Sequence, residues 1–225
     1  MTTSSSLDDR HRRLVIMGAG GHATSVASVA LAAGYRLEAF VDSSRAGEAH
    51  LGFDVIARLD DVAGLEDCAV VIAVGDNDVR HRIFAELGAQ YPSIRHATLV
   101  HPSAVVSAFA TLGAGSVLMP NAVVGANSRV GKCCIVNTAA CLDHDCVMDD
   151  FSSLAPRAVT GGGVRIGMRS AISMGAIVKN DVTVGEDSVV GANCFLDRNL
   201  AACKVAYGSV SREDRNRVPG EPYLS

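Results

Sequence analysis

Aliphatic residues recur every six positions along the second half of the chain. The series runs from Val100 to Leu196 without a break in register, and sixteen of its seventeen members are aliphatic, with Thr160 as the exception. Four residues after each of them stands a second, mostly small residue, such as Ala122 or Cys134. Six is a multiple of the strand period of two but does not match the helical period of 3.6, so both series can point inward together only in a coiled β ribbon. The pattern therefore predicts a β-solenoid in which each coil is covered by the next one.

Residues 14–98 follow a different pattern, in which short apolar runs alternate with helical stretches. Strands are predicted at residues 14–17, 37–41 and 69–74, and one helix runs to Gly34 while another carries Val79, Ile83 and Leu87 on one face. This alternation predicts a small Rossmann-like parallel α/β sheet, with its ligand crevice at the carboxyl ends of the strands. Three polar segments fall at those ends, namely residues 18–22, 42–43 and 75–77.

The glycine turn after the first strand has more than one interpretation. Gly18, Gly20 and Ala23, with Asp42 nineteen residues after Ala23, satisfy a relaxed dinucleotide fingerprint, which favours an NAD(P)-binding oxidoreductase. The α/β unit has room for one mononucleotide half only, which counts against that interpretation. A tight strand-to-helix turn that binds no ligand is the third possibility.

Composition narrows the class of protein. The 225 residues carry a formal net charge of −4, which argues against a nucleic-acid partner, and they contain no apolar run of the roughly 20 residues that span a bilayer. The seven cysteines lack zinc-site spacing, so we expect no metal, and their uneven number suits a reducing cytoplasm. We expect a disordered arm (1–13), the α/β domain (14–98), the solenoid (99–200) and a C-terminal tail (201–225).

Several motifs together resemble a known family. Glycine often follows the aliphatic residue of the hexad, as in Val124-Gly125 and Ile166-Gly167, and the segments 18–23, 74–80 and 100–104 also match. The chain resembles the hexapeptide-repeat acyltransferases, and within them the sialic acid O-acetyltransferases and the N-acetyltransferases of nucleotide-linked 4-amino sugars. The resemblance implies a Rossmann-like domain followed by a left-handed parallel β-helix.

The resemblance also implies an activity. It predicts an acetyl-CoA-dependent N-acetyltransferase that acts on a nucleotide-activated 4-amino-4,6-dideoxy sugar. The alternatives are O-acetylation of a sialic-acid-type sugar, an NAD(P)-binding oxidoreductase, and a non-catalytic scaffold that binds a nucleotide sugar.

The candidate catalytic group is His144. It occupies the third place of its hexad and should point outward, and a histidine with a pKa near 6.5 suits general-base chemistry at neutral pH. The resemblance implies that His144 is the base and that Asp145, where relatives usually have Glu, orients or polarises it, with Asp143 as the alternative. Neighbouring strand residues face opposite ways, so the pair can cooperate only at a corner or through a neighbouring subunit.

The resemblance assigns the binding residues as well. Phosphates of the nucleotide sugar are expected at Gly18, Gly20, Gly21 and His22, its nucleoside at Asp42 and Asn77, and the reacting sugar at Asn137. Acetyl-CoA is expected at Ser153, which replaces a histidine of many relatives, and at Gly162, Met174 and Ala192. Outward apolar residues favour a homotrimer with the donor groove between prisms, and they include Met119, Ala126, Ala139 and Cys141.

Overall fold

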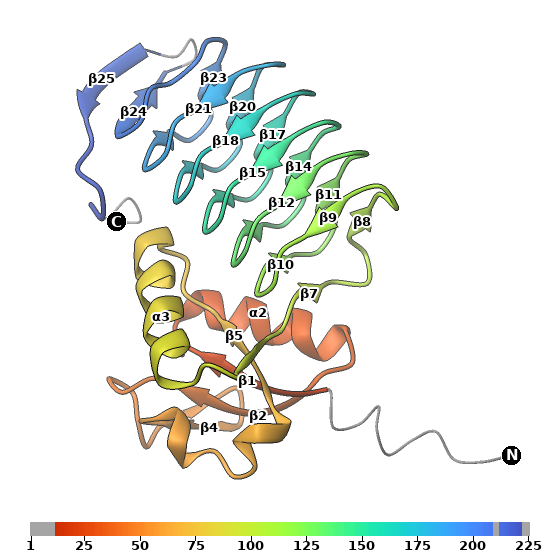
Figure 1. The fold of residues 1–225 in the computed structure, drawn as a ribbon, viewed down its shortest axis with the longest axis vertical. Coiled ribbons are helices and arrows are strands. Elements are labelled where there is room, and N and C mark those ends of the chain that lie inside the picture. Colours follow the sequence, from red (N-terminus) through yellow and green to blue (C-terminus); the bar gives the residue numbers. More distant parts are fainter. Residues whose placement is uncertain (1–11, 209–211, 222–225) are drawn as a thin grey trace, which may run out of the picture.

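A computed structural model describes residues 12–208 and 212–221 of the chain. It consists of an N-terminal α/β domain and a triangular prism of stacked coils (Figure 1), which confirms the predicted fold class. Residues 1–11 of the expected arm lie outside the described residues, whereas Arg13 at its end already belongs to the first strand. In the described residues, no helix has the length and apolar character that a membrane span requires.

The N-terminal domain is a six-stranded sheet in the order β3-β4-β2-β1-β5-β6, and only the β3–β4 pair is antiparallel. The predicted strands are β1 (Arg13–Met17), β2 (Arg36–Val41) and β5 (Ala69–Ile72), the last ending two residues earlier than expected. The sequence pattern missed the short strands β3 (Ala49–His50), β4 (Phe53–Ile56) and β6 (Arg95–His96) and the single 3₁₀ turns η1 (Leu59–Asp61) and η2 (Leu65–Asp67).

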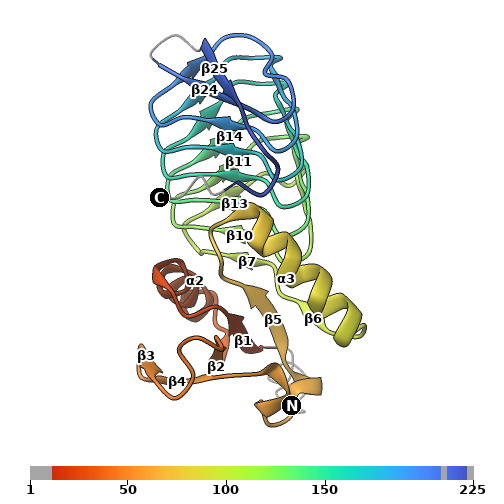
Figure 2. The same cartoon turned by 90° about the vertical axis from the view of Figure 1, so that its left-hand side faces the viewer.

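Two helices cover the sheet from opposite faces (Figure 2). Helix α2 (Gly21–Ala32) packs on Leu14 and Ile16, while α3 (Asn77–Gln90) packs through Leu87 on Val70 and Ile72. Alternate residues of β1 and β5 therefore feed two separate cores, as expected for a parallel strand covered on both sides.

Three columns of two-residue parallel strands form the faces of the prism. The first face holds β7 (Leu99–Val100), β10 (Val117–Leu118), β13 (Ile135–Val136), β16 (Ser153–Leu154), β19 (Ala171–Ile172) and β22 (Val189–Val190). The second holds β8 (Val105–Val106), β11 (Val123–Val124), β14 (Cys141–Leu142), β17 (Val159–Thr160), β20 (Ile177–Val178) and β23 (Phe195–Leu196). The third holds β9 (Thr111–Leu112), β12 (Arg129–Val130), β15 (Val147–Met148), β18 (Arg165–Ile166) and β21 (Thr183–Val184).

The six-residue register sets both the core and the corners of the prism. The aliphatic series and the small series point inward into one core, and Cys134, Cys146 and Cys194 lie buried in it as predicted. From Gly115 to Asn193, every sixth residue has a left-handed backbone, with φ between 48° and 78°. Asn, Asp and Gly tolerate this conformation best and hold most of these corner positions.

The outer residues of the three faces differ in what covers them. Those of the first face are buried. The N-terminal domain packs on β7 and β10, where Leu99, Val117 and Met119 join the core beneath α2, whereas Ala171 and Val189 cluster with Val205 near the C-terminus. Met119 therefore points out of the prism as expected, but it is buried beneath α2 and offers no surface to a neighbouring subunit. Outer residues of the third face are mostly exposed and polar, whereas those of the second face are apolar and partly exposed.

Hydrogen bonds from the first turn of α3 connect the N-terminal domain to the prism. The guanidinium of Arg80, whose side chain is buried, donates to the carbonyl oxygens of Cys133 at 2.7 Å and Phe151 at 2.8 Å. It also donates to Oδ1 of Asn77 at 2.6 Å, and the Asn77 amide donates in turn to the carbonyl oxygen of Ser170 at 3.1 Å. Cys133 and Phe151, which are left-handed corners of successive coils, thus supply acceptors for α3.

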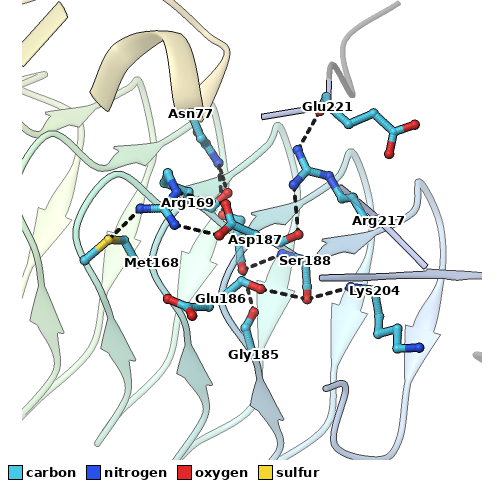
Figure 3. A network of polar contacts seen from close by, with 11 residues as sticks. Asn77, Met168, Arg169, Gly185, Glu186, Asp187, Ser188, Lys204, Arg217 and Glu221 are labelled. Atoms are coloured by element: carbon cyan, nitrogen blue, oxygen red, sulfur yellow. Dashed lines mark hydrogen bonds and ion pairs between the residues drawn. The ribbon is translucent and has the colours of Figure 1, made fainter. Parts of the chain in front are cut away.

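The C-terminal segment, expected as a polar tail, contains two strands instead. Strand β24 (Lys204–Tyr207) pairs in parallel with β22, and β25 (Arg212–Asn216) pairs with β24 in antiparallel fashion. Arg217 then donates to the carbonyl oxygens of Asp187 at 2.8 Å and Glu221 at 2.6 Å (Figure 3). Because Asp187 also forms a bidentate ion pair with Arg169, the segment is tied to the prism beside α3.

Candidate active site

His144 and Asp145 lie at the corner between β14 and β15, where the second and third faces meet. Nδ1 of His144 is 2.7 Å from Oδ2 of Asp145, and the side chains are 58% and 54% exposed. Asp145 has a φ of 58°, and this left-handed turn allows two consecutive residues to share one side of the chain. The corner therefore brings together the pair that an extended strand would keep apart, and His144 points outward as predicted.

Neighbouring groups shift the pKa values of His144 and Asp145 in opposite directions. The hydrogen bond to Asp145 raises the pKa of His144, and the negative charge of Asp143 raises it further. The pKa of Asp145 is lowered, first by a hydrogen bond from Asn127 and then by the one from His144. Asp143 accepts a hydrogen bond from the backbone N–H of His144 at 2.7 Å through Oδ1, so it also shapes the corner.

The imidazole of His144 lies over Gly162 on the next coil. A Cβ atom at Gly162 would stand 2.4 Å from Cε1 and 2.7 Å from Nε2 of the ring. The bond to Asp145 engages Nδ1, so Nε2 is the ring nitrogen that can accept a proton from a substrate. Gly162, expected beside acetyl-CoA, thus serves in this structure as the surface on which the histidine lies.

A cavity of about 540 Å³ lies between the first face, the N-terminal domain and the C-terminal segment. Asn137, Ser153, Met174 and Ala192, four of the residues expected at the reacting sugar or at acetyl-CoA, line this cavity. Other walls come from His22 and Gly75 of the N-terminal domain and from Tyr207 and Arg217 near the C-terminus. His144 is not among the residues that line this cavity.

A second cavity, of about 430 Å³, lies at the carboxyl ends of β1 and β2 beside α3. Gly18 and Asp42 line it together with Ser43, Arg58 and Tyr91. Oδ2 of Asp42 accepts the backbone N–H of Ala19 at 3.1 Å, and Oδ1 accepts the Ser44 hydroxyl at 2.6 Å. Burial raises the pKa of Asp42, but these hydrogen bonds outweigh that effect and hold its pKa below the usual value.

The glycine turn separates the two cavities. Gly18 has a φ of 100° and packs against Ala73 and Val74, so this position requires glycine. Gly20 and Gly21 are exposed at the start of α2, where no described side chain caps the helix, whereas Asp76 caps α3. The exposed N–H groups of a helix N-terminus are suited to an anion.

His22 and Asn77 have different surroundings in the structure. His22 faces the larger cavity, and burial, assisted by the charge of Arg80, lowers its pKa to about 4, so it is a neutral group there. Asn77 is fully buried between α3 and the prism, so it has a structural position rather than one beside a nucleoside.

Two polar residues were missed by the sequence reasoning. Asn127 contacts Asp145, and Arg80 holds the domains together. Asn127 lies 18 residues before Asp145, which is one coil of the prism, so the hexad register contained the signal that places them side by side. Among the described residues, no group of three His, Cys, Asp or Glu side chains could hold a metal ion.

An α/β domain on a β-helix that carries an outward His–Asp pair defines a class of acyltransferase, and comparisons with known proteins agree. The family model described as the PglD N-terminal domain matches residues 13–87. The acetyltransferase domain of PglB from Neisseria gonorrhoeae FA1090 aligns with a TM-score of 0.84 and 36% identity, covering 90% of this chain and 99% of that one. That domain has also been solved in complex with acetyl coenzyme A.

A second similar structure is PerB from Caulobacter crescentus in complex with CoA and GDP-perosamine. It aligns with a TM-score of 0.82 and 32% identity, covering 90% of this chain and 97% of that one. Protein L142 of Acanthamoeba polyphaga mimivirus is 26% identical over 118 residues, and this match spans 52% of the present chain but only 23% of that relative. The chain belongs to the same family of left-handed β-helix acetyltransferases as PglB and PerB.

Proposed function

We propose that this protein transfers the acetyl group of acetyl-CoA to the amino group of a nucleotide-linked 4-amino-4,6-dideoxy sugar. The observation that carries the proposal is the outward His144 imidazole, fixed through Nδ1 by Asp145 at 2.7 Å. It occurs on a chain whose relatives have been solved with acetyl coenzyme A in one case and with CoA and GDP-perosamine in another.

The chemistry follows from a proton transfer at Nε2 of His144. As the amine nitrogen attacks the thioester carbonyl carbon, a C–N bond forms and Nε2 accepts the proton that the amine loses. The C–S bond then breaks, and the CoA sulfur leaves as a thiolate that takes the proton back from the imidazolium. Because neighbouring carboxylates raise the pKa of His144, the ring is a stronger base, and the rate falls as pH drops through this raised pKa.

The two cavities suit the two substrates. The 430 Å³ cavity takes the nucleoside beside Asp42, and the exposed turn at Gly20 and Gly21 takes the diphosphate through backbone N–H groups. The 540 Å³ cavity takes the reacting end of the sugar and the thioester arm, along Asn137, Ser153, Met174 and Ala192. We assign to His22, a neutral group that lines this cavity, a hydrogen bond with the sugar phosphate.

The enzyme works as a homotrimer in this proposal. The outer positions of the second face form a continuous apolar column, namely Val105, Val123, Cys141, Val159, Ile177 and Phe195. Exposed apolar columns of this kind are typical of protein interfaces. His144 borders one edge of the second face and Asn137 the other, so packing through this face lets the histidine of one protomer complete the cavity of its neighbour.

We further place the enzyme in the cytoplasm. All seven cysteines are free, and burial raises the pKa of Cys133 to about 12 and that of Cys134 to about 11. Such thiols are unreactive and serve as core residues, which suits a reducing compartment.

Direct assay tests the function. The protein is incubated with acetyl-CoA and with nucleotide-linked 4-amino-4,6-dideoxy sugars, and CoA thiol release is compared with acetylation of the sugar by mass spectrometry. We expect His144→Ala to lower kcat about 10²- to 10⁴-fold, because a general base is lost without leaving a cavity. His101→Ala, which removes a prism histidine bonded to Ser103, is the control and should keep wild-type turnover. Thiol release that is equal with and without sugar would contradict the proposal.

A further inference from the structure

Both oxygens of the Asp145 carboxylate have side-chain partners. Oδ2 is 2.7 Å from Nδ1 of His144, and Oδ1 accepts a hydrogen bond from Nδ2 of Asn127 at 2.6 Å. Asn127 lies at the corner between β11 and β12, one coil before the catalytic corner between β14 and β15. These two coils are neighbours in the stack (Figure 1). Its φ of 60° matches the 58° of Asp145, so the two side chains leave equivalent corners of adjacent coils.

We propose that Asn127 is a positioning residue for the acetyl transfer, which holds the Asp145 carboxylate in the orientation that fixes the His144 ring. The role of Asn127 in catalysis rests on the proposed function, whereas its hydrogen bond to Asp145 does not.

The need for such a residue follows from the exposure of the pair. Asp145 is a surface carboxylate beside a surface histidine, and hydrogen bonds from two donors to its two oxygens define the plane of a group that could otherwise rotate. An ionised carboxylate only accepts hydrogen bonds, so the Asn127 amide must present its NH₂ group. Asparagine also adds no charge and tolerates the left-handed corner, a combination that aspartate and branched residues lack.

The acidic groups that act on His144 come from two coils. Asp143 and Asp145 belong to its own corner, and Asp181 lies on the coil that follows Gly162 and Gly163. The hydrogen bond to Asp145 is the largest cause of the raised pKa of His144, ahead of these charges. The pKa of His144 therefore reports whether the Asp145 carboxylate is correctly oriented.

A double-mutant cycle tests the proposal. The pKa of His144 is measured by NMR titration of the full-length wild type, Asn127→Gly, Asp145→Asn and the double variant. Glycine suits the left-handed corner, so the fold is retained. We expect Asn127→Gly to lower the pKa of His144, because the released carboxylate no longer holds its hydrogen bond. In the double variant the pKa should equal that of Asp145→Asn alone, since Asn127 acts only through Asp145.

Kinetics of the same variants give a second measure. We expect kcat of Asn127→Gly to fall about three- to tenfold, the net scale of one typical hydrogen bond, with the KM for acetyl-CoA unchanged. Asn121→Gly removes an asparagine from another left-handed corner, with a φ of 58°, and should alter neither kcat nor the pKa of His144.

Other outcomes would overturn the proposal. An unchanged or raised pKa of His144 in Asn127→Gly, or additive effects in the double variant, would mean that Asn127 does not orient Asp145. If the wild type acetylates no nucleotide-linked amino sugar, the proposed function fails, while the NMR cycle still decides the role of Asn127.

Discussion

The imidazole of His144 occupies the space that a side chain at position 162 would need. A methyl group at Gly162 would overlap Cε1 of the ring at 2.4 Å, and the hydrogen bond to Asp145 holds the ring through Nδ1. The hydrogen bond and the backbone of the next coil together set the ring orientation. The side chain of His144 therefore loses its conformational entropy before substrates bind, and this cost does not add to the barrier of the reaction.

Gly162→Ala tests this arrangement. We expect kcat to fall about 10- to 100-fold, because a displacement of the base by about 1 Å misaligns proton transfer. The midpoint of urea unfolding should change little, since the overlapping atoms belong to the end of a movable side chain. Gly88→Ala, at an exposed helix position with no atom near the new Cβ, is the control and should keep full activity. Wild-type turnover of Gly162→Ala would mean that the ring tilts freely during catalysis.

The sequence predicted the orientation of a side chain correctly where the six-residue register of the prism alone determines it. The third place of the hexad placed His144 on the outside, and the structure has it there. It failed for Asn77, because a polar residue at the end of a parallel strand looks the same whether a ligand or a neighbouring domain binds it. Only the packing of α3 on the prism distinguishes the two, and this packing has no periodic signal in the sequence.

At the scale of single elements, α2 and α3 use their N-termini differently. Asp76 caps α3 by accepting the N–H groups of Asp78 and Val79 at 3.0 Å each, while α2 begins at two exposed glycines. The first helix thus keeps the positive end of its dipole open, and the second is fixed against the prism.

Gly20→Val separates a ligand site from a structural turn. The new side chain meets no atom of the protein within 4 Å, and the extended backbone there, with φ of −84°, accepts valine. We expect the KM for the nucleotide sugar to rise about tenfold or more, since the side chain blocks the approach of the diphosphate, and the KM for acetyl-CoA to stay unchanged. Equal impairment toward both substrates, or none, would assign the turn a structural role only.

Arg80 forms buried hydrogen bonds that hold α3 on the prism. Arg80→Met should lower the free energy of unfolding by about 2–4 kcal/mol, because carbonyl oxygens of Val74, Cys133 and Phe151 lose a buried donor. Urea denaturation followed by circular dichroism measures this loss. Arg82→Met removes an exposed arginine of the same helix and should change the free energy of unfolding by less than about 0.5 kcal/mol. Equal stability of the two variants would contradict this role.

For the whole molecule, the sequence predicted the prism but not what covers its faces. The outer residues of the first face, such as Leu99 and Val117, are as apolar as Val105 and Val123 on the second face. The first set is buried by the N-terminal domain and the second is left partly exposed. The hexad repeat shows which residues point outward. It does not show where another domain packs, because that packing depends on shape and on individual contacts such as the hydrogen bonds of Arg80.

The second face should therefore govern both assembly and activity. Ile177, the fifth of the six residues in its apolar column, is 48% exposed, and Ile177→Asp places a charge in the surface that would be buried between protomers. Light scattering should give three times the mass of the 225-residue chain for the wild type and the mass of one chain for Ile177→Asp. Acetyl transfer should be lost with the trimer, because His144 does not line the cavity of its own protomer among the described residues. Thr183→Asp, on the polar third face, should remain trimeric and active. A fully active monomeric Ile177→Asp variant would show that one protomer contains the complete site.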